Sequence, residues 1–453
     1  MVSSSFKTLL ALAGLAASAT AAPSGTYSSR FAARNPQRRA ATTGPVSFGY
    51  FANWHAGSLG FTADKIPAKD LTHVLYSFMD SDKATGALML SDPATDTGNV
   101  TSGTLGGQLG ALFELKKANR HLKTLFSIGG WNYSQDKHFA FMKDPAEVHR
   151  RCAVLRRELW FDGVDIDYEA FAADELDDFV NLFKELREAL DKMQKDKGDK
   201  APYLLTSAVF TKNEAWCAKA TEYLDYFLLM AYDFSGAWVN TTAYQSNLLA
   251  DGQVNGGLSV ESGVTSFLTH TPAERIVMGQ PLYARTFAEA TGYNQPYNGV
   301  GSTDGILLYK DLPASGDTVH EDLTLGAAYS LDPATKVFAT YDTPGVTKVK
   351  SKYIKDKGLG GAMWWDLATD KTGADSLVTV AHTALGDLDS TENHINFPNS
   401  VYDNVKAAGG DSQTPGGGGE VSTEPPASTT PPTETSTPVP TSSPSTCARR
   451  RRA

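Results

Sequence analysis

The stretch Asp162–Glu169 constrains what this chain can fold into more than any other part of the sequence, and it reads Asp-Gly-Val-Asp-Ile-Asp-Tyr-Glu. In a β-strand, side chains alternate between two faces. Asp165, Asp167 and Glu169 are therefore expected on one face, with neighbours roughly 6.5 Å apart along the backbone. The Val, Ile and Tyr between them face the other way, which predicts a strand buried beneath a helix.

Three carboxyl groups on one strand face favour acid–base chemistry. A carboxyl group that is repelled by its neighbours or removed from water keeps its proton to higher pH, which a general acid requires. Two other interpretations stay open at this point, a solvated edge strand and a set of ligands for a divalent cation. Asp162 does not fit the alternation of the other acids, and we expect it to have a structural role at the start of the strand.

Eight short apolar or β-branched runs recur from residue 46 onward, with helical patterns between them. This alternation is typical of a (β/α)8 barrel. The expected strands are Val46–Ala52, His73–Met79, Lys123–Gly130, Gly163–Glu169, Tyr203–Phe210, Tyr226–Asp233, Arg275–Tyr283 and Gly360–Leu367. The predicted fold class is thus α/β, a TIM barrel within residues 44–388.

The connection between the seventh and eighth runs, about residues 286–350, is too long for an ordinary loop. It contains alternating segments of its own, such as Lys336–Tyr341. We therefore expect a small α+β insertion beside the mouth of the barrel, where it would raise one wall of a cleft.

Both ends of the chain differ in composition from the barrel. Residues 1–22 combine a basic residue, an apolar run and small residues, which predicts a secretory signal peptide. Residues 23–43 form a basic leader, which could be a propeptide or a disordered segment. Residues 409–446 are rich in Ser, Thr and Pro, which predicts a disordered linker, and residues 447–453 are an Arg-rich tail.

Charge and cysteine content limit the partners and the architecture. The formal net charge of −10 disfavours nucleic acid and anionic membranes as partners. The chain has three cysteines, too few for a disulfide-dense scaffold, and pairing of Cys152 with Cys217 stays open. Sequons for N-glycosylation occur at three positions, Asn99, Asn132 and Asn240.

Aromatic residues gather where several of the runs end. Catalytic groups of TIM barrels lie at the C-terminal ends of the strands. Trp54, Trp131, Tyr232, Tyr283 and Trp365 all follow or end such runs. Each alone could belong to the core, but together with the acids they indicate a cleft for sugars, whose apolar faces stack on aromatic rings.

Three motifs resemble those of the family 18 glycoside hydrolases, the chitinases. Asp162–Glu169 is similar to the family's DxxDxDxE signature, Ser127–Gly130 to its SxGG motif and Met230–Asp233 to its MxYD motif. The expected insertion resembles the chitinase insertion domain of the larger, bacterial-type members of the family. Members of this type are common in fungi, where they are called class V chitinases.

The resemblance implies a substrate-assisted, retaining mechanism, which is an exception to the usual scheme of two carboxylates. Glu169 would protonate the glycosidic oxygen and later activate water, while the acetamido carbonyl of the sugar attacks and gives an oxazolinium intermediate. Asp167 would orient the acetamide and share a proton with Asp165, and Tyr232 would hydrogen-bond the same acetamide.

The same matching implies residues that bind sugar. Trp365, rather than its neighbour Trp364, would form the floor of the site. The implied substrate-binding residues are Tyr50, Phe78, Trp131, Met230, Asp233, Trp238, Tyr283, Arg285 and Trp365.

We therefore expect a secreted chitinase that hydrolyses β-1,4 linkages of N-acetylglucosamine polymers as a monomer, with chitin and chito-oligosaccharides as partners. No metal or organic cofactor is expected, because acid, base and nucleophile are all accounted for. The alternatives are an endo-β-N-acetylglucosaminidase acting on N-glycans, a non-catalytic chitin-binding lectin on the same barrel, and a structural cell-wall protein tethered by its linker.

Overall fold

The computed structural model describes residues 42–82, 88–98, 103–144, 146–147, 160–211, 216–252 and 255–409. The predicted signal peptide, most of the leader, the linker from residue 410 and the Arg-rich tail lie outside these residues, as do Asn99 and Cys152. Cys217 is buried. Within the described residues, no helix is both long enough and apolar enough to cross a membrane.

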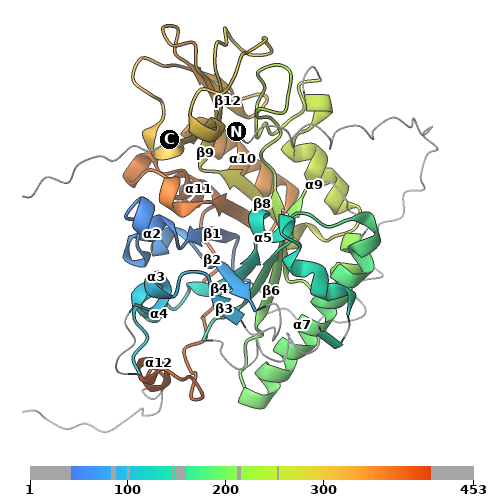
Figure 1. Ribbon diagram of the computed structural model, residues 1–453, viewed down its shortest axis with the longest axis vertical. Helices are drawn as coiled ribbons and strands as arrows, with labels where there is room; N and C mark the ends of the chain where they lie inside the picture. The colour runs from blue at the N-terminus through green and yellow to red at the C-terminus, as the bar shows by residue number, and fades with distance from the viewer. Residues whose placement is uncertain are drawn as a thin grey trace, which may run out of the picture. The chain divides into compact units, whose positions relative to one another are not determined.

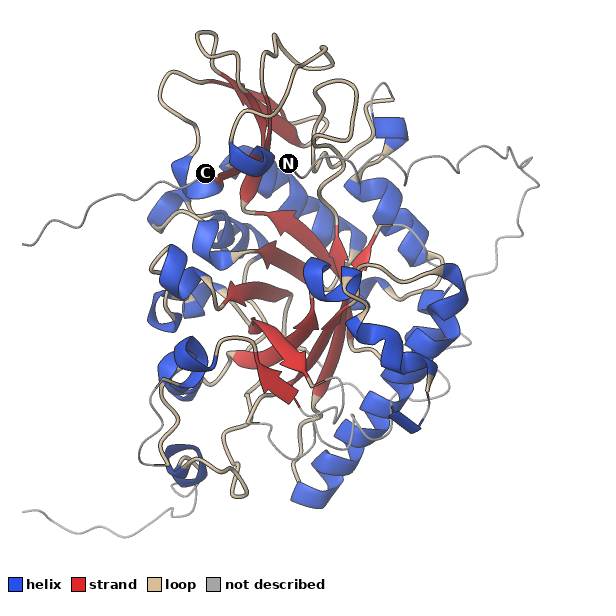
Figure 2. Ribbon diagram, viewed as in Figure 1, coloured by secondary structure: helices blue, strands red, loops and turns tan. Residues whose placement is uncertain are grey.

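Eight parallel strands form a closed barrel at the centre of the molecule (Figures 1 and 2). The barrel closes because β1 pairs with both β2 and β14. The barrel strands are β1 (Val46–Ala52), β2 (His73–Ser81), β4 (Lys123–Gly129), β5 (Gly163–Asp167), β6 (Leu204–Phe210), β7 (Tyr226–Met230), β8 (Ile276–Pro281) and β14 (Gly361–Trp365). The predicted TIM barrel is therefore confirmed. The short strand β3 (Leu88–Leu90) pairs antiparallel with the end of β2.

Helices surround the strands in Figure 2. The described α-helices are α2 (His55–Ser58), α3 (Pro93–Thr97), α4 (Gly107–Ala118), α5 (Trp131–Gln135), α7 (Leu176–Lys197), α8 (Cys217–Ala220), α9 (Val260–Leu268), α10 (Pro344–Lys357), α11 (Leu377–Leu385) and α12 (Asp403–Ala407). In α7 the buried residues follow the three-and-four spacing of a helix that covers a core on one side. This helix ends at Lys197 and is followed by Gly198, which adopts the left-handed conformation that glycine tolerates at a helix end.

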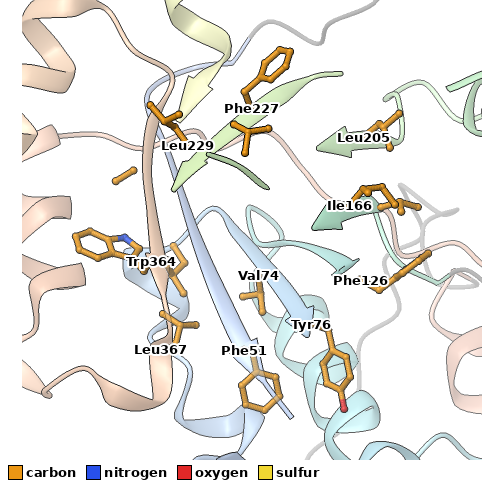
Figure 3. Packing of buried hydrophobic residues seen from close by; sticks show 14 of the residues in the cluster. Phe51, Val74, Tyr76, Phe126, Ile166, Leu205, Phe227, Leu229, Trp364 and Leu367 are labelled. Atoms are coloured by element: carbon orange, nitrogen blue, oxygen red, sulfur yellow. The ribbon is translucent and has the colours of Figure 1, made fainter. Parts of the chain in front are cut away.

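The strands have two apolar faces because side chains alternate along them. The outer face packs against the helices and carries residues such as Val74, Phe126, Ile166 and Trp364 (Figure 3). The inner face fills the barrel and has its own cluster, which includes Phe48, Leu75, Leu125, Leu228 and Met363. The acids of β5 lie on this inner face, between apolar layers.

The connection between β8 and β14 contains a separate antiparallel sheet, labelled β9 and β12 at the top of Figure 1. Its strands are β9 (Tyr283–Phe287), β10 (Ile306–Leu308), β11 (Thr318–Asp322), β12 (Ala327–Leu331) and β13 (Phe338–Thr340). Helix α10 then leads back to the barrel. Its N-terminus is capped by Thr343, whose Oγ1 accepts the backbone N–H of Val346 at 3.2 Å, and Pro344 occupies the first turn.

Residues 386–409, hereafter the C-terminal segment, pack against the end of the barrel where the strands begin. The backbone N–H of His394 donates to Asp162 Oδ1 at 2.7 Å, and Asp162 Oδ2 lies 2.8 Å from Lys116 Nζ. The side-chain amide of Asn393 donates to three carbonyls at the end of α4 and the following turn. Asp162 therefore joins β5, α4 and this segment.

Candidate active site

Asp165 is held at the centre of the barrel by three hydroxyl groups. Ser127 on β4 and Thr206 on β6 are its register partners on the two neighbouring strands. Ser127 Oγ donates to Asp165 Oδ2 at 2.7 Å and Thr206 Oγ1 to Oδ1 at 2.6 Å, while Tyr50 Oη reaches across the barrel to Oδ2 at 2.9 Å. Burial raises the pKa of Asp165, and the three hydroxyl donors oppose that rise.

Asp167 is buried two residues further along the same face, with only 4% of its surface exposed. Its Oδ1 atom has no hydrogen-bond partner among the described residues. Burial raises the pKa of Asp167 well above its ordinary value, and the negative charges of Glu169 and Asp165 add to the effect. Since Asp165 has three donors and Asp167 Oδ1 has none, we expect a proton shared within this pair to reside mainly on Asp167.

Glu169 follows the end of β5, at the mouth of the barrel. Burial is the main cause that raises its pKa from 4.5 to about 7, and the charge of Asp233 is the second. A carboxyl group with such a pKa is half protonated near neutral pH and can both donate and accept a proton. Glu169 is thus suited to general acid–base catalysis.

Tyr232 lies among these acids. Burial raises the pKa of its phenol well above the ordinary value, and the charges of Asp167, Asp233, Glu169 and Asp165 do so further. The hydroxyl therefore stays protonated and able to donate a hydrogen bond.

Asp233, at the end of the Met230–Asp233 motif, is fixed by two residues of β9. Arg285 donates to both of its carboxylate oxygens, with Nε at 2.7 Å from Oδ1 and Nη2 at 2.5 Å from Oδ2. Tyr283 Oη donates to Oδ1 at 2.7 Å. The first strand of the insertion sheet thus contributes directly to the site, and the bidentate pair fixes the orientation of the Asp233 carboxylate.

The two glycines of the Ser127–Gly130 motif make room for the acids and the aromatic floor. A Cβ atom on Gly129 would lie 1.9 Å from the carbonyl oxygen of Asp167, and one on Gly130 would lie 2.6 Å from the ring of Phe78. Their φ angles are 131° and 84°, in the region that favours glycine. Larger residues here would displace both β5 and Phe78.

Aromatic rings line the inner mouth of the barrel. Trp365 stacks on Phe78 with ring centres 5.8 Å apart and contacts Tyr50 edge-on at 5.1 Å. Trp365 points into the barrel, whereas Trp364 is fully buried on the outer face. Met230 at the end of β7 belongs to the same inner cluster as Trp365. The structure therefore brings together Tyr50, Phe78, Met230 and Trp365.

Large exposed side chains mark the rim. Trp131 at the start of α5 is 51% exposed and Trp238 is 48% exposed. The guanidinium of Arg285 lies 5.0 Å from the ring centre of Trp238. The sequons at Asn132 and Asn240 are also exposed, each close in sequence to one of these tryptophans.

Trp54 was expected at a strand end but was not among the implied substrate-binding residues, and Phe210 and Thr206 were not singled out by the sequence. Trp54 is 44% exposed and stacks on Phe78 with ring centres 6.0 Å apart, and Phe210 is exposed at the end of β6. Trp54 follows β1 and Phe210 is the last residue of β6, and this position at strand ends was the available signal. Thr206 has no sequence signal, because its contact with Asp165 depends on strand register.

In this arrangement Glu169 can donate and accept a proton. Tyr232 can donate a hydrogen bond to a ligand, and Asp167 Oδ1 can accept one. The ring of Trp365 offers a flat surface on which a ligand can stack. Among the residues that the structure describes, no group of three or more His, Cys, Asp or Glu side chains is placed to hold a metal ion.

Comparison with known proteins gives concordant findings. Residues 46–370 match the model of the family described as glycosyl hydrolases family 18. The chain is 36% identical over 380 residues to chitinase 1 of Aphanocladium album, covering 79% of this chain and 89% of that protein. It is 34% identical over 384 residues to endochitinase 1 of Metarhizium robertsii, covering 80% and 90%. The solved structure of a group IV chitinase from Ostrinia furnacalis is similar with a TM-score of 0.66 at 26% identity, covering 76% of this chain and all of that one.

Proposed function

The chain belongs to family 18 of the glycosyl hydrolases and is of the chitinase class, and from this premise we propose that it cleaves β-1,4 linkages between N-acetylglucosamine units by a substrate-assisted, retaining mechanism. We propose further that it is secreted and acts as a monomer on chitin and chito-oligosaccharides. The signal-peptide pattern of residues 1–22 supports secretion.

The buried Oδ1 of Asp167 is the observation that carries the proposal. A buried polar atom without a partner is costly, and a ligand that donates a hydrogen bond to Asp167 Oδ1 would remove that cost. The acetamide N–H of N-acetylglucosamine is a donor of the required type. Asp167 Oδ1 accepts this N–H, while the proton of the Asp165–Asp167 pair stays on the other carboxyl oxygen of Asp167.

The first step breaks the bond between the anomeric carbon and the glycosidic oxygen. Glu169, protonated below its pKa of about 7, gives its proton to the leaving oxygen. The acetamido carbonyl oxygen attacks the anomeric carbon and closes the oxazolinium ring. Tyr232 donates a hydrogen bond to this acetamide, and Asp167 aligns it from the nitrogen side.

The second step reverses the roles. The Glu169 carboxylate takes a proton from a water molecule, whose oxygen attacks the anomeric carbon and reopens the ring. Two inversions at that carbon give net retention of configuration. Trp365 supports the sugar at this position, and the exposed rings of Trp131 and Trp238 extend the stacking surface on the leaving-group side.

The test is the release of soluble oligosaccharides from colloidal chitin by the full chain, with Glu169→Gln alongside. Glu188→Gln is the matched control, because Glu188 lies 60% exposed on α7 and pairs only loosely with Lys184 at 3.9 Å. We expect Glu169→Gln to lose at least about a hundredfold, the lower range for removing general acid–base help, and Glu188→Gln to match the wild type.

Three outcomes would contradict the proposal. Binding of chitin without release of sugar would favour a lectin. Cleavage of high-mannose glycans alone would favour an endo-β-N-acetylglucosaminidase. Nuclear magnetic resonance of the first product formed would overturn the retaining mechanism if the α anomer appeared before the β anomer.

A further inference from the structure

Ser134 lies beneath the site and does not belong to any of the three motifs. It is the fourth residue of the short helix α5, which directly follows β4 and the two glycines. Only 2% of Ser134 is exposed, although the residues around it on α5 are partly or fully open to solvent. A buried hydroxyl needs partners, and those of Ser134 are informative.

Both hydrogen-bonding functions of the Ser134 hydroxyl point to the end of β5. Its Oγ accepts the backbone N–H of Glu169 at 2.9 Å, and it donates to the backbone carbonyl of Asp167 at 3.4 Å. The shorter contact is the stronger one. The same carbonyl also accepts the N–H of Gly130 at 2.9 Å.

The contact with Glu169 replaces a missing bond of the sheet. The register between β4 and β5 ends at the pair Gly129 and Asp167. Glu169 lies two residues beyond this pair, so its N–H has no partner in the ladder. Ser134 supplies the acceptor, and the backbone from which the Glu169 side chain projects is held in place after the strand has ended.

We infer that Ser134 is a positioning residue for the general acid, acting through the backbone of Glu169 and without contact to the substrate. The inference rests on the proposed role of Glu169. This role explains why a buried serine lies three residues after Trp131 on α5. Helix α5 then positions both Trp131 at the rim and the backbone of Glu169.

The test compares kinetic constants of the full chain with those of Ser134→Ala, Ser134→Thr and Asn132→Gln. Ser134→Ala removes the hydroxyl and also destroys the sequon at Asn132, whereas Asn132→Gln destroys the sequon and keeps the hydroxyl. Ser134→Thr keeps both. The assay is hydrolysis of a soluble chito-oligosaccharide as a function of pH.

We expect kcat of Ser134→Ala to fall by about tenfold to a hundredfold with KM within about twofold, because a displacement near 1 Å costs up to about a hundredfold. The alkaline limb of the pH profile should also move to lower pH, since a displaced Glu169 becomes more hydrated. Ser134→Thr should recover most of kcat, and Asn132→Gln should behave as the wild type.

The inference is overturned if Ser134→Ala keeps the wild-type kcat and pH profile, or if Asn132→Gln reproduces its loss. Should Ser134→Ala fail to fold, Ser134→Cys replaces the oxygen by a weaker acceptor and should change kcat and the pH profile in the same direction. Full activity of Glu169→Gln would instead refute the proposed function, so that the two failures are distinguishable.

Discussion

Replacing Asp233 by Asn should shift the pH at which activity is lost. Burial and the charge of Asp233 together raise the pKa of Glu169 from 4.5 to about 7. That difference corresponds to about 3 kcal/mol in favour of the neutral carboxyl group. Burial is the larger cause, so the charge of Asp233 accounts for less than half of this free-energy difference. We take its share as about 1.4 kcal/mol, which corresponds to about 1 pKa unit.

The direction of the shift follows from the charges. Asp233→Asn removes a negative charge and leaves the guanidinium of Arg285 without its partner, and both changes favour ionised Glu169. The acid must be protonated to work, so activity is lost as the pH rises through its pKa. The alkaline limb of kcat/KM should therefore move from about pH 7 to about pH 6.

The assay is kcat/KM for a soluble chito-oligosaccharide between about pH 4 and pH 9, which reports the pKa values of the free enzyme. Asp233→Asn will also lower the overall rate, but the position of the limb does not depend on the height of the curve. Tyr283→Phe is the control, because it removes one hydrogen bond to Asp233 and keeps the charge. An alkaline limb at or above the wild-type position in Asp233→Asn, or an equal shift in Tyr283→Phe, would refute the reasoning.

Three further predictions concern stability. Glu169→Gln should be more stable than the wild type at pH 8 but not at pH 4, and thermal melts at both pH values check this. The reason is that the raised pKa of Glu169 lowers the stability of the wild type increasingly between pH 4.5 and about pH 7. Asp162→Asn should lower the free energy of unfolding in urea by about 3–5 kcal/mol, because it leaves the buried Lys116 ammonium without its carboxylate, and a loss under 1 kcal/mol would contradict the buried pair. Trp364→Ala should lose about 3–5 kcal/mol of stability, whereas Trp365→Ala should lose mainly activity; comparable melting temperatures for the two variants would speak against their assignment to opposite faces.

The barrel could be predicted from the sequence because its information is local. Each strand is a short apolar run, and the alternation within Asp162–Glu169 already separates the acids from Val164 and Ile166. The choice of Trp365 over Trp364 as the inward ring came from the resemblance to the family, and the structure has the two rings on opposite faces.

Other parts of the site depend on contacts between distant segments, which no local pattern encodes. Thr206 meets Asp165 because β6 pairs with β5 in one register, and Tyr50 meets it across the barrel. Most of the C-terminal segment lies beyond the predicted end of the barrel at residue 388, yet Phe397 and Val405 are buried. The sequence analysis assigned residues 389–408 neither to the barrel nor to the linker, and part of their packing is through backbone groups and amides.

The pairing of β5 on both sides has a consequence for how chains of this kind can diverge. β5 is hydrogen-bonded to β4 and to β6, and its two faces have opposite character. Insertion or deletion of one residue within the strand would turn the following acids toward the helices and the apolar residues into the barrel. In descendants of this chain, single residues of the strand can therefore be substituted, and such substitutions can abolish or alter activity. The number of residues in the strand, by contrast, is fixed by the fold.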